Sequence, residues 1–261
     1  MAREHQDYVV PSGGLPPQTT MVTSRAIVRP RYMILPPSVT PSSNLPFWKE
    51  TTSWILAAPQ LGFGVGFAEY LLYVGTGGGC QEPEFEDGVE GFLFVLEGRM
   101  QLTIEGDAYD LPTGGYAYLP PDTDWTLCNE AESLLKLLWL RKLYEPLDGL
   151  APQTIVGHEQ EAGKYLIPSD DMAYDLNMNI VSLEPGANVP ITELHVMEHG
   201  LYMLQGKGVY LLGENWHEVQ AGDFIWMRAY CPQSYYAGGP ETTRYLLYKN
   251  VNRHISLLCQ S

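Results

Sequence analysis

The sequence predicts an all-β fold, and two observations support this prediction. The first is that, from Trp54 onward, the chain consists of short apolar or alternating runs separated by Gly, Pro, Asn and Asp, as at residues 92–96, 100–104 and 134–140. Strands at this spacing, with turns between them, are typical of an antiparallel sandwich or barrel. Few windows show a sustained period of 3.6 residues, so helices are not expected to dominate.

The second observation is an internal repeat. When the chain is shifted by 108 residues, Gly98 falls on Gly206, Gly114 falls on Gly222, and residues 95–98 align with residues 203–206. Self-similarity at a fixed period indicates repeated structural units. The chain is therefore predicted to be a tandem of two similar β units.

Proline marks the N-terminal region as different from these units. The first 50 residues hold eight of the 20 prolines, and proline is excluded from helix interiors and central strands. We expect an extended N-terminal arm with one short strand, at residues 25–29 or 31–35. The predicted organisation is listed in chain order: arm 1–53, first unit 54–145, linker 146–165, second unit 166–261.

Composition limits the partners and the compartment. The formal charge is −16, from 15 Lys and Arg against 31 Asp and Glu, which argues against nucleic acid and against an anionic membrane surface. The chain shows neither a secretory leader nor a run of about 18 apolar residues. Its four cysteines are far apart and form no C-x-x-C pair, so free thiols in a reducing compartment are expected. The predicted location is the cytoplasm.

Two of the six histidines lie close together and beside a carboxylate. Glu193 and His195 form a Glu-x-His pair, and His199 follows four residues later. On a strand, a pair at this spacing directs both side chains to one face. His199 follows a short turn, so its side chain can come back toward those of Glu193 and His195. One carboxylate and two imidazoles on one side are suitable ligands for a divalent metal.

These motifs and the repeat resemble the cupin family. In the second half, Glu193 takes the slot of the first cupin histidine, His195 that of the second, and His199 that of the glutamate. Gly206 closes this first motif, and the slot of the last cupin histidine falls on Gln233. The resemblance implies a tandem double cupin, in which two jelly-roll-like β-barrels follow the extended N-terminal arm.

The same slots in the first half hold other residue types. They fall on Phe85, Asp87, Gly91 and Trp125. Of these, Asp87 alone can ligate a metal, and one carboxylate is not enough to hold an ion. We therefore expect the first unit to be metal-free and the chain to bind one ion.

Within the cupins, the order of the ligand slots, followed by residues 245–249 (Tyr-Leu-Leu-Tyr-Lys), resembles the (S)-ureidoglycine aminohydrolases, bicupins of purine and ureide breakdown. The resemblance implies one Mn²⁺ per chain, held by four residues: Glu193, His195, His199 and Gln233. It implies substrate contacts by five residues: Glu193, Tyr210, Gln233, Tyr245 and Lys249. The implied catalytic residues are Glu193 and Lys249, and which of them is the principal base is left open.

The small-molecule substrate implied by this resemblance is a ureide that carries an amine, a ureido nitrogen and a carboxylate on one carbon. Water replaces the amine, which releases ammonia and leaves ureidoglycolate. Two alternatives remain open from the sequence. Two His and one carboxylate also serve non-haem Fe(II) dioxygenases, and a metal-stabilised bicupin could bind ligands without catalysis. Spacing alone leaves Fe²⁺, Ni²⁺ and Zn²⁺ open beside Mn²⁺.

Two further expectations concern the surroundings of the site. Asp175, Asn177 and Asn179 alternate with apolar residues, so their face of the strand is expected to look into the barrel and Asn177 to line the pocket. Tandem cupins expose sheet edges, and such edges are usually paired or covered. We therefore expect a homo-oligomer to which residues 1–50 contribute contacts.

Overall fold

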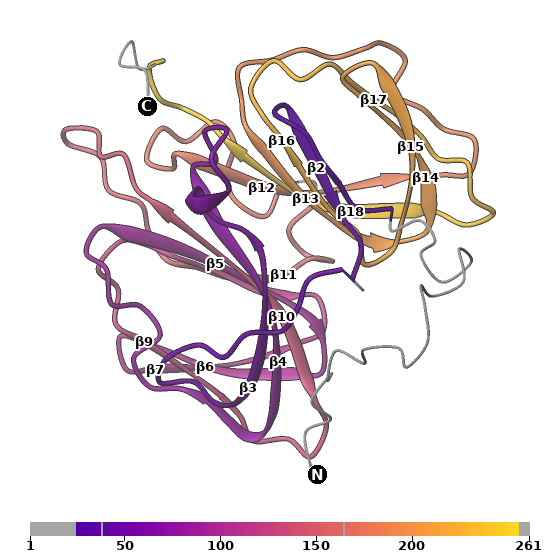
Figure 1. Ribbon diagram of the computed structural model, residues 1–261. Coiled ribbons are helices and arrows are strands. Elements are labelled where there is room, and N and C mark those ends of the chain that lie inside the picture. The colour runs from indigo at the N-terminus through magenta and orange to yellow at the C-terminus, as the bar shows by residue number, and fades with distance from the viewer. Residues whose placement is uncertain (1–24, 38, 164, 256–261) are drawn as a thin grey trace, which may run out of the picture.

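The computed structural model describes residues 25–37, 39–163 and 165–255 (Figure 1). Every regular element in this part of the chain is a β-strand, apart from one 3-10 turn, η1 (Pro59–Leu61). The predicted all-β fold is therefore confirmed. No helix in the described residues is long and apolar enough to cross a membrane.

The N-terminal unit is one curled sheet around an apolar core. The strand order is β11-β8-β5-β10-β4-β9-β6-β7, with β3 paired to β4. Leu72, Val95 and Leu127 are among the fully buried side chains of this core. The strands are β3 (Lys49–Ala57), β4 (Phe67–Cys80), β5 (Val89–Glu97), β6 (Arg99–Ile104), β7 (Asp107–Pro112), β8 (Gly115–Leu119), β9 (Trp125–Asn129), β10 (Leu135–Leu143) and β11 (Ile155–His158).

The C-terminal unit consists of two sheets that share a second core. The larger sheet has the order β1-β2-β16-β13-β18-β12, and the smaller one the order β15-β14-β17. Leu201 and Leu247 from the larger sheet and Leu212 from the smaller sheet belong to the same buried cluster. The strands are β1 (Ile27–Val28), β2 (Tyr32–Leu35), β12 (Leu176–Leu183), β13 (His199–Gln205), β14 (Lys207–Leu212), β15 (Asn215–Gln220), β16 (Phe224–Met227), β17 (Gln233–Tyr236) and β18 (Thr243–Asn250).

The internal repeat is visible in the backbone. Gly98 and Gly206 follow β5 and β13 with φ of 89° and 75°, and Gly114 and Gly222 precede β8 and β16 with φ of 84° and 88°. Glycine adopts these left-handed conformations without steric cost. The matching glycines therefore turn the chain in the same way in both units, which agrees with the predicted tandem double cupin.

The two units pack against each other through a third apolar core. Phe67 of β4 and Tyr248 of β18 meet with ring centroids 4.5 Å apart, within a cluster to which both units contribute. A buried ion pair lies between the units, where Lys142 Nζ is 2.5 Å from Asp175 Oδ2. The facing sides of the two larger sheets are thus removed from water, and the other two cores fill the barrel interiors. Ligand sites are therefore expected at the barrel ends.

Part of the predicted arm belongs to the C-terminal unit. Both candidate segments contain strands, and β2 pairs with β16 so that Ile34 lies opposite Ile225. Within the predicted linker, β11 pairs with β8. Residues 1–24 of the arm lie outside the described residues, and the predicted boundaries between arm, units and linker remain a prediction.

Candidate functional site

The predicted ligands approach one another from three segments of the C-terminal unit. Glu193 and Gln233 form an isolated bridge, in which each backbone N–H donates to the other residue's carbonyl at 2.8 and 3.0 Å. The expected strand at the Glu-x-His pair is wrong, because His195 lies in an irregular segment before β13. His199 is the first residue of β13. Strand pairing, and not strand alternation, thus brings Glu193 to the site.

The two imidazoles lie side by side at the end of the barrel. The ring centroids of His195 and His199 are 4.5 Å apart. His199 is only 2% exposed, and its Nε2 is buried with no hydrogen-bond partner. Burial, the neighbouring His195 and Lys249 hold the pKa of His199 well below its usual value. Its ring is therefore neutral at pH 7, with a nitrogen available to a ligand.

His195 is in the same chemical state. Burial and Lys249 lower its pKa, although Glu193 opposes this shift. The Glu193 Oε2 atom is 3.9 Å from His195 Nε2, and the Glu193 side chain is 46% exposed. His195 is thus a neutral imidazole beside a carboxylate that reaches solvent.

A buried tyrosine holds the amide of Gln233. The Tyr210 hydroxyl donates to Gln233 Oε1 at 2.9 Å, and Gln233 Nε2 is 3.0 Å from His195 Nε2. Burial raises the pKa of Tyr210 well above its usual value, so its hydroxyl remains a donor. Tyr210 therefore contacts a predicted ligand directly, whereas its predicted contact with substrate remains a prediction.

Lys249 lies on the same face as His199. It stands opposite His199 on β13 and opposite Asn177 on β12, and all three strands direct their other residues of this face into the barrel core. Asn177 is buried and donates from Nδ2 to the Ile167 carbonyl at 3.2 Å. Asn177 therefore lies on the strand face that was expected to look into the barrel, and its role in lining the pocket stays a prediction. Asp175, which was expected on the same face, instead pairs with Lys142 between the two units.

Tyr245 lies deeper in the same barrel. It is four residues before Lys249 on β18, is 5% exposed, and packs with its ring centroid 5.8 Å from that of Tyr235. Burial raises its pKa, so the hydroxyl is protonated. The structure places Tyr245 in the core that supports the site, and its predicted substrate contact is untested.

The donor set fits a divalent metal. Two neutral imidazoles, one carboxylate and one amide are ligand types that metals such as Mn²⁺ accept, and the unpartnered Nε2 of His199 is a buried polar atom that a metal would satisfy. Among the described residues, no group of three His, Cys, Asp or Glu side chains is arranged so that it could hold a metal ion. Metal binding would therefore need the exposed Glu193 side chain to turn toward the imidazoles. It would also need the Gln233 amide, whose nitrogen faces His195 in this structure, to present its oxygen as the fourth donor.

Sequence reasoning missed one buried residue beside His199. The carboxylate of Glu198 accepts hydrogen bonds from Gly66 N at 3.1 and 3.2 Å and from Trp226 Nε1 at 2.6 Å. Its backbone N–H donates to Asn250 Oδ1 at 2.6 Å. Glu198 thus joins the N-terminal unit, β16 and the end of β18 at the strand end that carries His199. Alternation along β13 could have shown that it faces away from the barrel, but not what it meets there.

Replacing Glu198 with alanine is expected to destabilise the protein. The Gly66 N–H and the Trp226 indole would lose their acceptor inside the protein, at about 1–3 kcal/mol for each unsatisfied buried donor. Urea denaturation would show a lower midpoint for Glu198→Ala and a smaller change for Glu198→Gln, which keeps an acceptor oxygen. The matched control is Glu214→Ala at an exposed position. Equal midpoints for the two alanine variants would contradict this role.

Known proteins resemble the C-terminal unit and, beyond it, most of the chain. The Cupin domain family model matches residues 179–248. The (S)-ureidoglycine aminohydrolase of Escherichia coli (strain K12) is 32% identical over 251 residues, which cover 91% of this chain and 95% of that protein. The Arabidopsis thaliana protein of the same name is 33% identical over 243 residues, which cover 88% of this chain and 79% of that protein.

A solved structure resembles the whole chain. A glyoxylate-induced protein of Pseudomonas aeruginosa is 39% identical, with a TM-score of 0.86 over 98% of this chain and 100% of that one. The fold is that of a bicupin, and its C-terminal unit brings Glu193, His195, His199 and Gln233 close together. The chain belongs to the (S)-ureidoglycine aminohydrolase family.

Proposed function

We propose that this protein hydrolyses (S)-ureidoglycine to (S)-ureidoglycolate and ammonia with the help of one Mn²⁺ ion. The observation that carries the proposal is the convergence of His195, His199 and Gln233 below the exposed carboxylate of Glu193, with Lys249 on the adjacent strand. Family membership indicates the reaction, and the ligand set indicates where it takes place.

Four residues would hold the metal: Glu193, His195, His199 and Gln233. Two nitrogen and two oxygen donors are compatible with the six-coordinate geometry of Mn²⁺ and leave positions for substrate. A bound divalent ion would polarise and orient the substrate atoms that chelate it. The neutral rings of His195 and His199 supply the nitrogen lone pairs, because burial disfavours their protonation.

The chain's own residues would manage charge and protons. Glu193 is exposed and can accept a proton from the attacking water at a carboxylate oxygen, then return it to the departing nitrogen, which leaves as ammonia. The C–N bond breaks as the C–O bond to the water oxygen forms. Lys249 would pair its ammonium group with the substrate carboxylate, which has few other cationic partners in a chain of net charge −16.

The experiment is the release of ammonia from freshly generated (S)-ureidoglycine by metal-free protein, with and without added Mn²⁺. We expect turnover that depends on the metal and no uptake of oxygen. Oxygen consumption with Fe²⁺ and none with Mn²⁺ would support a dioxygenase instead. A Mn²⁺-dependent rise in melting temperature without ammonia release would indicate a binding protein and would overturn the proposal.

We also propose a cytoplasmic homo-oligomer in which the N-terminal segment contributes contacts. The hairpin of β1 and β2 already covers the edge of the C-terminal sheet at β16, so a truncation of residues 1–24 keeps this pairing. Light scattering should show an assembly for the full chain and a smaller species after truncation. A monomer at micromolar concentration, or an unchanged size, would contradict this expectation.

A further inference from the structure

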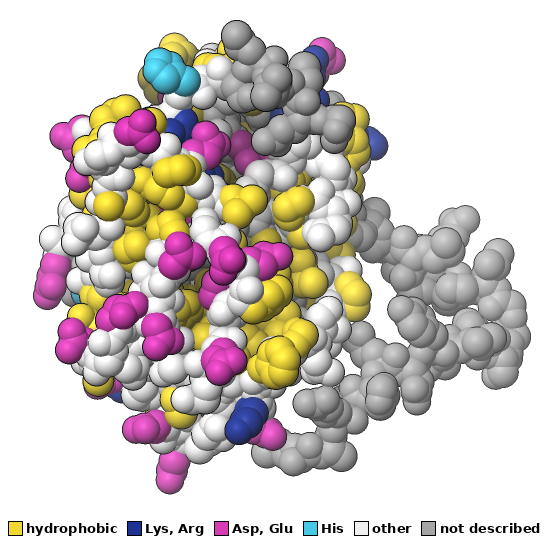
Figure 2. Space-filling view, turned by 90° about the vertical axis from the view of Figure 1, so that its left-hand side faces the viewer, with side chains coloured by type: hydrophobic (Ala, Val, Ile, Leu, Met, Phe, Trp, Pro, Cys, Tyr) yellow, Lys and Arg dark blue, Asp and Glu magenta, His cyan; other side chains and the backbone are white. Residues whose placement is uncertain are grey.

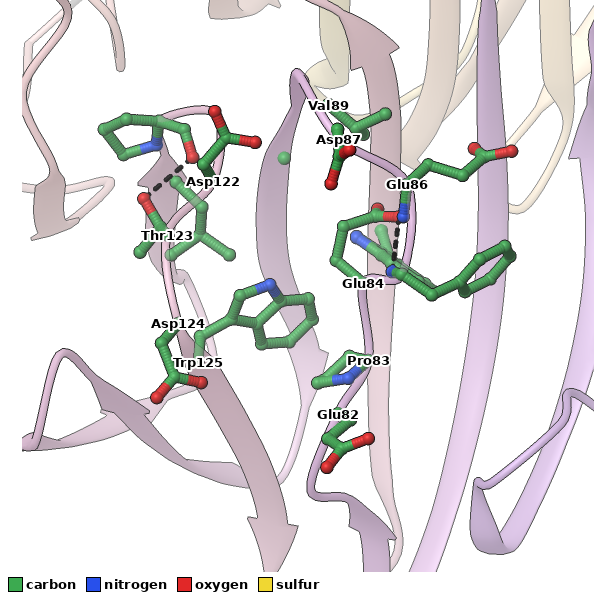
Figure 3. A pocket seen from close by; sticks show the side chains of 15 residues that line it. Glu82, Pro83, Glu84, Glu86, Asp87, Val89, Asp122, Thr123, Asp124 and Trp125 are labelled. Atoms are coloured by element: carbon green, nitrogen blue, oxygen red, sulfur yellow. Dashed lines mark hydrogen bonds between the residues drawn. The ribbon is translucent and has the colours of Figure 1, made fainter.

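The N-terminal unit contains a pocket at the open end of its barrel. The pocket has a volume of about 320 Å³ and lies between residues 82–91 on one side and residues 119–125 on the other, with Trp139 at its wall. Figure 3 shows the Trp125 indole reaching into the space between these two segments. The pocket is separate from the candidate metal site, which is in the other unit.

The pocket occupies the position that the metal ligands occupy in the C-terminal unit. All four first-half slots line it: Phe85, Asp87, Gly91 and Trp125. Gly91 lies on β5, where the repeat places His199 on β13. A Cβ atom added at Gly91 would meet its nearest neighbour at an ordinary 3.6 Å, so the backbone packing does not require glycine. The missing side chain leaves free volume where the other unit has an imidazole.

The lining is strongly acidic. Six carboxylates surround the pocket: Glu82, Glu84, Glu86, Asp87, Asp122 and Asp124. The nearby cation is Arg141, which the repeat aligns with Lys249. Its guanidinium is bound to Glu84 and Glu86 and lies 5.3 Å from the ring centroids of Phe85 and Trp139. Arg141 therefore neutralises part of the acidic rim, and a net negative charge remains.

One face of the molecule shows the same excess of negative charge. On the face shown in Figure 2, Asp and Glu side chains lie around apolar ones and outnumber Lys and Arg. A cleft lined by one sign of charge raises the local concentration of ligands of the opposite sign. The pocket thus selects against anions such as a free carboxylate and favours a cation.

Two buried indoles provide an independent indication of a ligand. Trp125 is 5% exposed and Trp139 is 3% exposed, and both line the pocket. Neither indole N–H donates a hydrogen bond to another described residue, although both rings make aromatic contacts. An indole nitrogen is a donor only, and neither of these two nitrogens is among the sealed side-chain atoms without a partner, so both N–H groups are open to the pocket; the Trp139 nitrogen lies 3.7 Å from the position of a Cβ atom at Gly91. The ligand should therefore offer an acceptor oxygen to these N–H groups, while its cationic end meets the carboxylates and the aromatic faces.

We propose that the N-terminal unit binds a small organic cation, an ammonium or guanidinium compound that also carries a neutral carbonyl or hydroxyl oxygen, in the pocket between Asp87 and Trp125. This site is distinct from the proposed hydrolytic site and needs no turnover there. The volume suits a ligand of a few heavy atoms, since small-molecule pockets start at about 300 Å³.

The test is calorimetric titration of the full-length metal-loaded protein with three probes: glycinamide, ethanolamine and 2-hydroxyethylguanidine. At least one probe should bind once per chain, with a Kd on the order of 1 mM or tighter. Acetamide, which lacks the cation, and propylamine, which lacks the oxygen, should bind at least about tenfold more weakly than the best probe, the factor that 1.4 kcal/mol produces.

Four variants test whether the probes bind in the pocket of the N-terminal unit. Gly91→Val fills the pocket and should abolish the titration, while Asp87→Asn and Trp125→Phe should each weaken it at least about tenfold. The exposed Asp107→Asn serves as the matched control and should bind normally. Circular dichroism and ammonia release should be unchanged in all four variants, which separates a failure of this proposal from a failure of the proposed function.

Three results would overturn the proposal. They are the absence of saturable binding for all three probes, binding that survives Gly91→Val, and complete displacement by Ca²⁺ or Mg²⁺ at equal concentration. The second result would place the ligand elsewhere in the chain, and the third would indicate an inorganic cation site. Loss of folding in Gly91→Val would leave Asp87→Asn and Trp125→Phe to decide.

Discussion

Replacing His199 with alanine is expected to abolish Mn²⁺-dependent ammonia release and to remove the bound ion. His199 is 2% exposed and its Nε2 has no hydrogen-bond partner among the described residues. Burial of this unpaired nitrogen costs folding free energy, which a bound metal would offset. Without metal, the variant should be about as stable as the parent, because the change also removes an unsatisfied buried group. Metal content by elemental analysis, ammonia release and melting temperature should be measured on one preparation.

The stability readout separates metal binding from folding. A ligand that binds only the folded state raises stability in proportion to RT ln(1 + [L]/Kd). Added Mn²⁺ should therefore raise the melting temperature of the parent and of the control His254→Ala, which changes an exposed histidine, but not that of His199→Ala. Two ions per chain in the parent, or one ion retained in the double variant His195→Ala/His199→Ala, would refute the proposed metal site.

Replacing Lys249 with methionine should leave metal content and fold intact and lower kcat/KM by about 10²-fold or more, the range expected for loss of a charged partner in the transition state. Lys249 stands opposite His199 in the β13–β18 ladder, and its charge lowers the pKa of both imidazoles, so it lies near the reacting groups. In the proposed mechanism its ammonium group meets the substrate carboxylate.

Lys249→Arg should not restore activity, because a planar guanidinium cannot replace a compact ammonium group in a small pocket. Lys207→Met, at an exposed position on β14, is the matched control and should retain activity. Metal content, circular dichroism and ammonia release on the same samples decide the outcome. Near-normal turnover in Lys249→Met would remove this residue from the site.

The two units carry different residues at the positions that the 108-residue repeat aligns. The repeat aligns Arg141 with Lys249, and Gly91 with His199. In the C-terminal unit these positions hold a cation and an imidazole that face a metal-ligand set. In the N-terminal unit the cation is bound by Glu84 and Glu86, and the imidazole is replaced by free volume. The same positions of the two barrels thus carry side chains of different chemistry.

The sequence by itself determined the strand-rich fold, the tandem repeat and the residue types at the ligand slots. These depend on features of the residue order: alternation with period two, glycines at turns that need a positive φ, and self-similarity at a shift of 108 residues. Such features can be recognised from the sequence alone, without knowing which distant segments are in contact. The position of Asn177 opposite Lys249 followed from alternation in the same way.

Only the tertiary structure decided which distant segments meet. The bridge between Glu193 and Gln233 replaces the strand expected for the Glu-x-His pair, β2 joins the C-terminal sheet through β16, and Glu198 ties His199 to the N-terminal unit through Gly66. These contacts join residues about 40 to 190 positions apart. Their pairing is set by burial and by the need to satisfy buried polar groups across the whole molecule, which no local pattern contains.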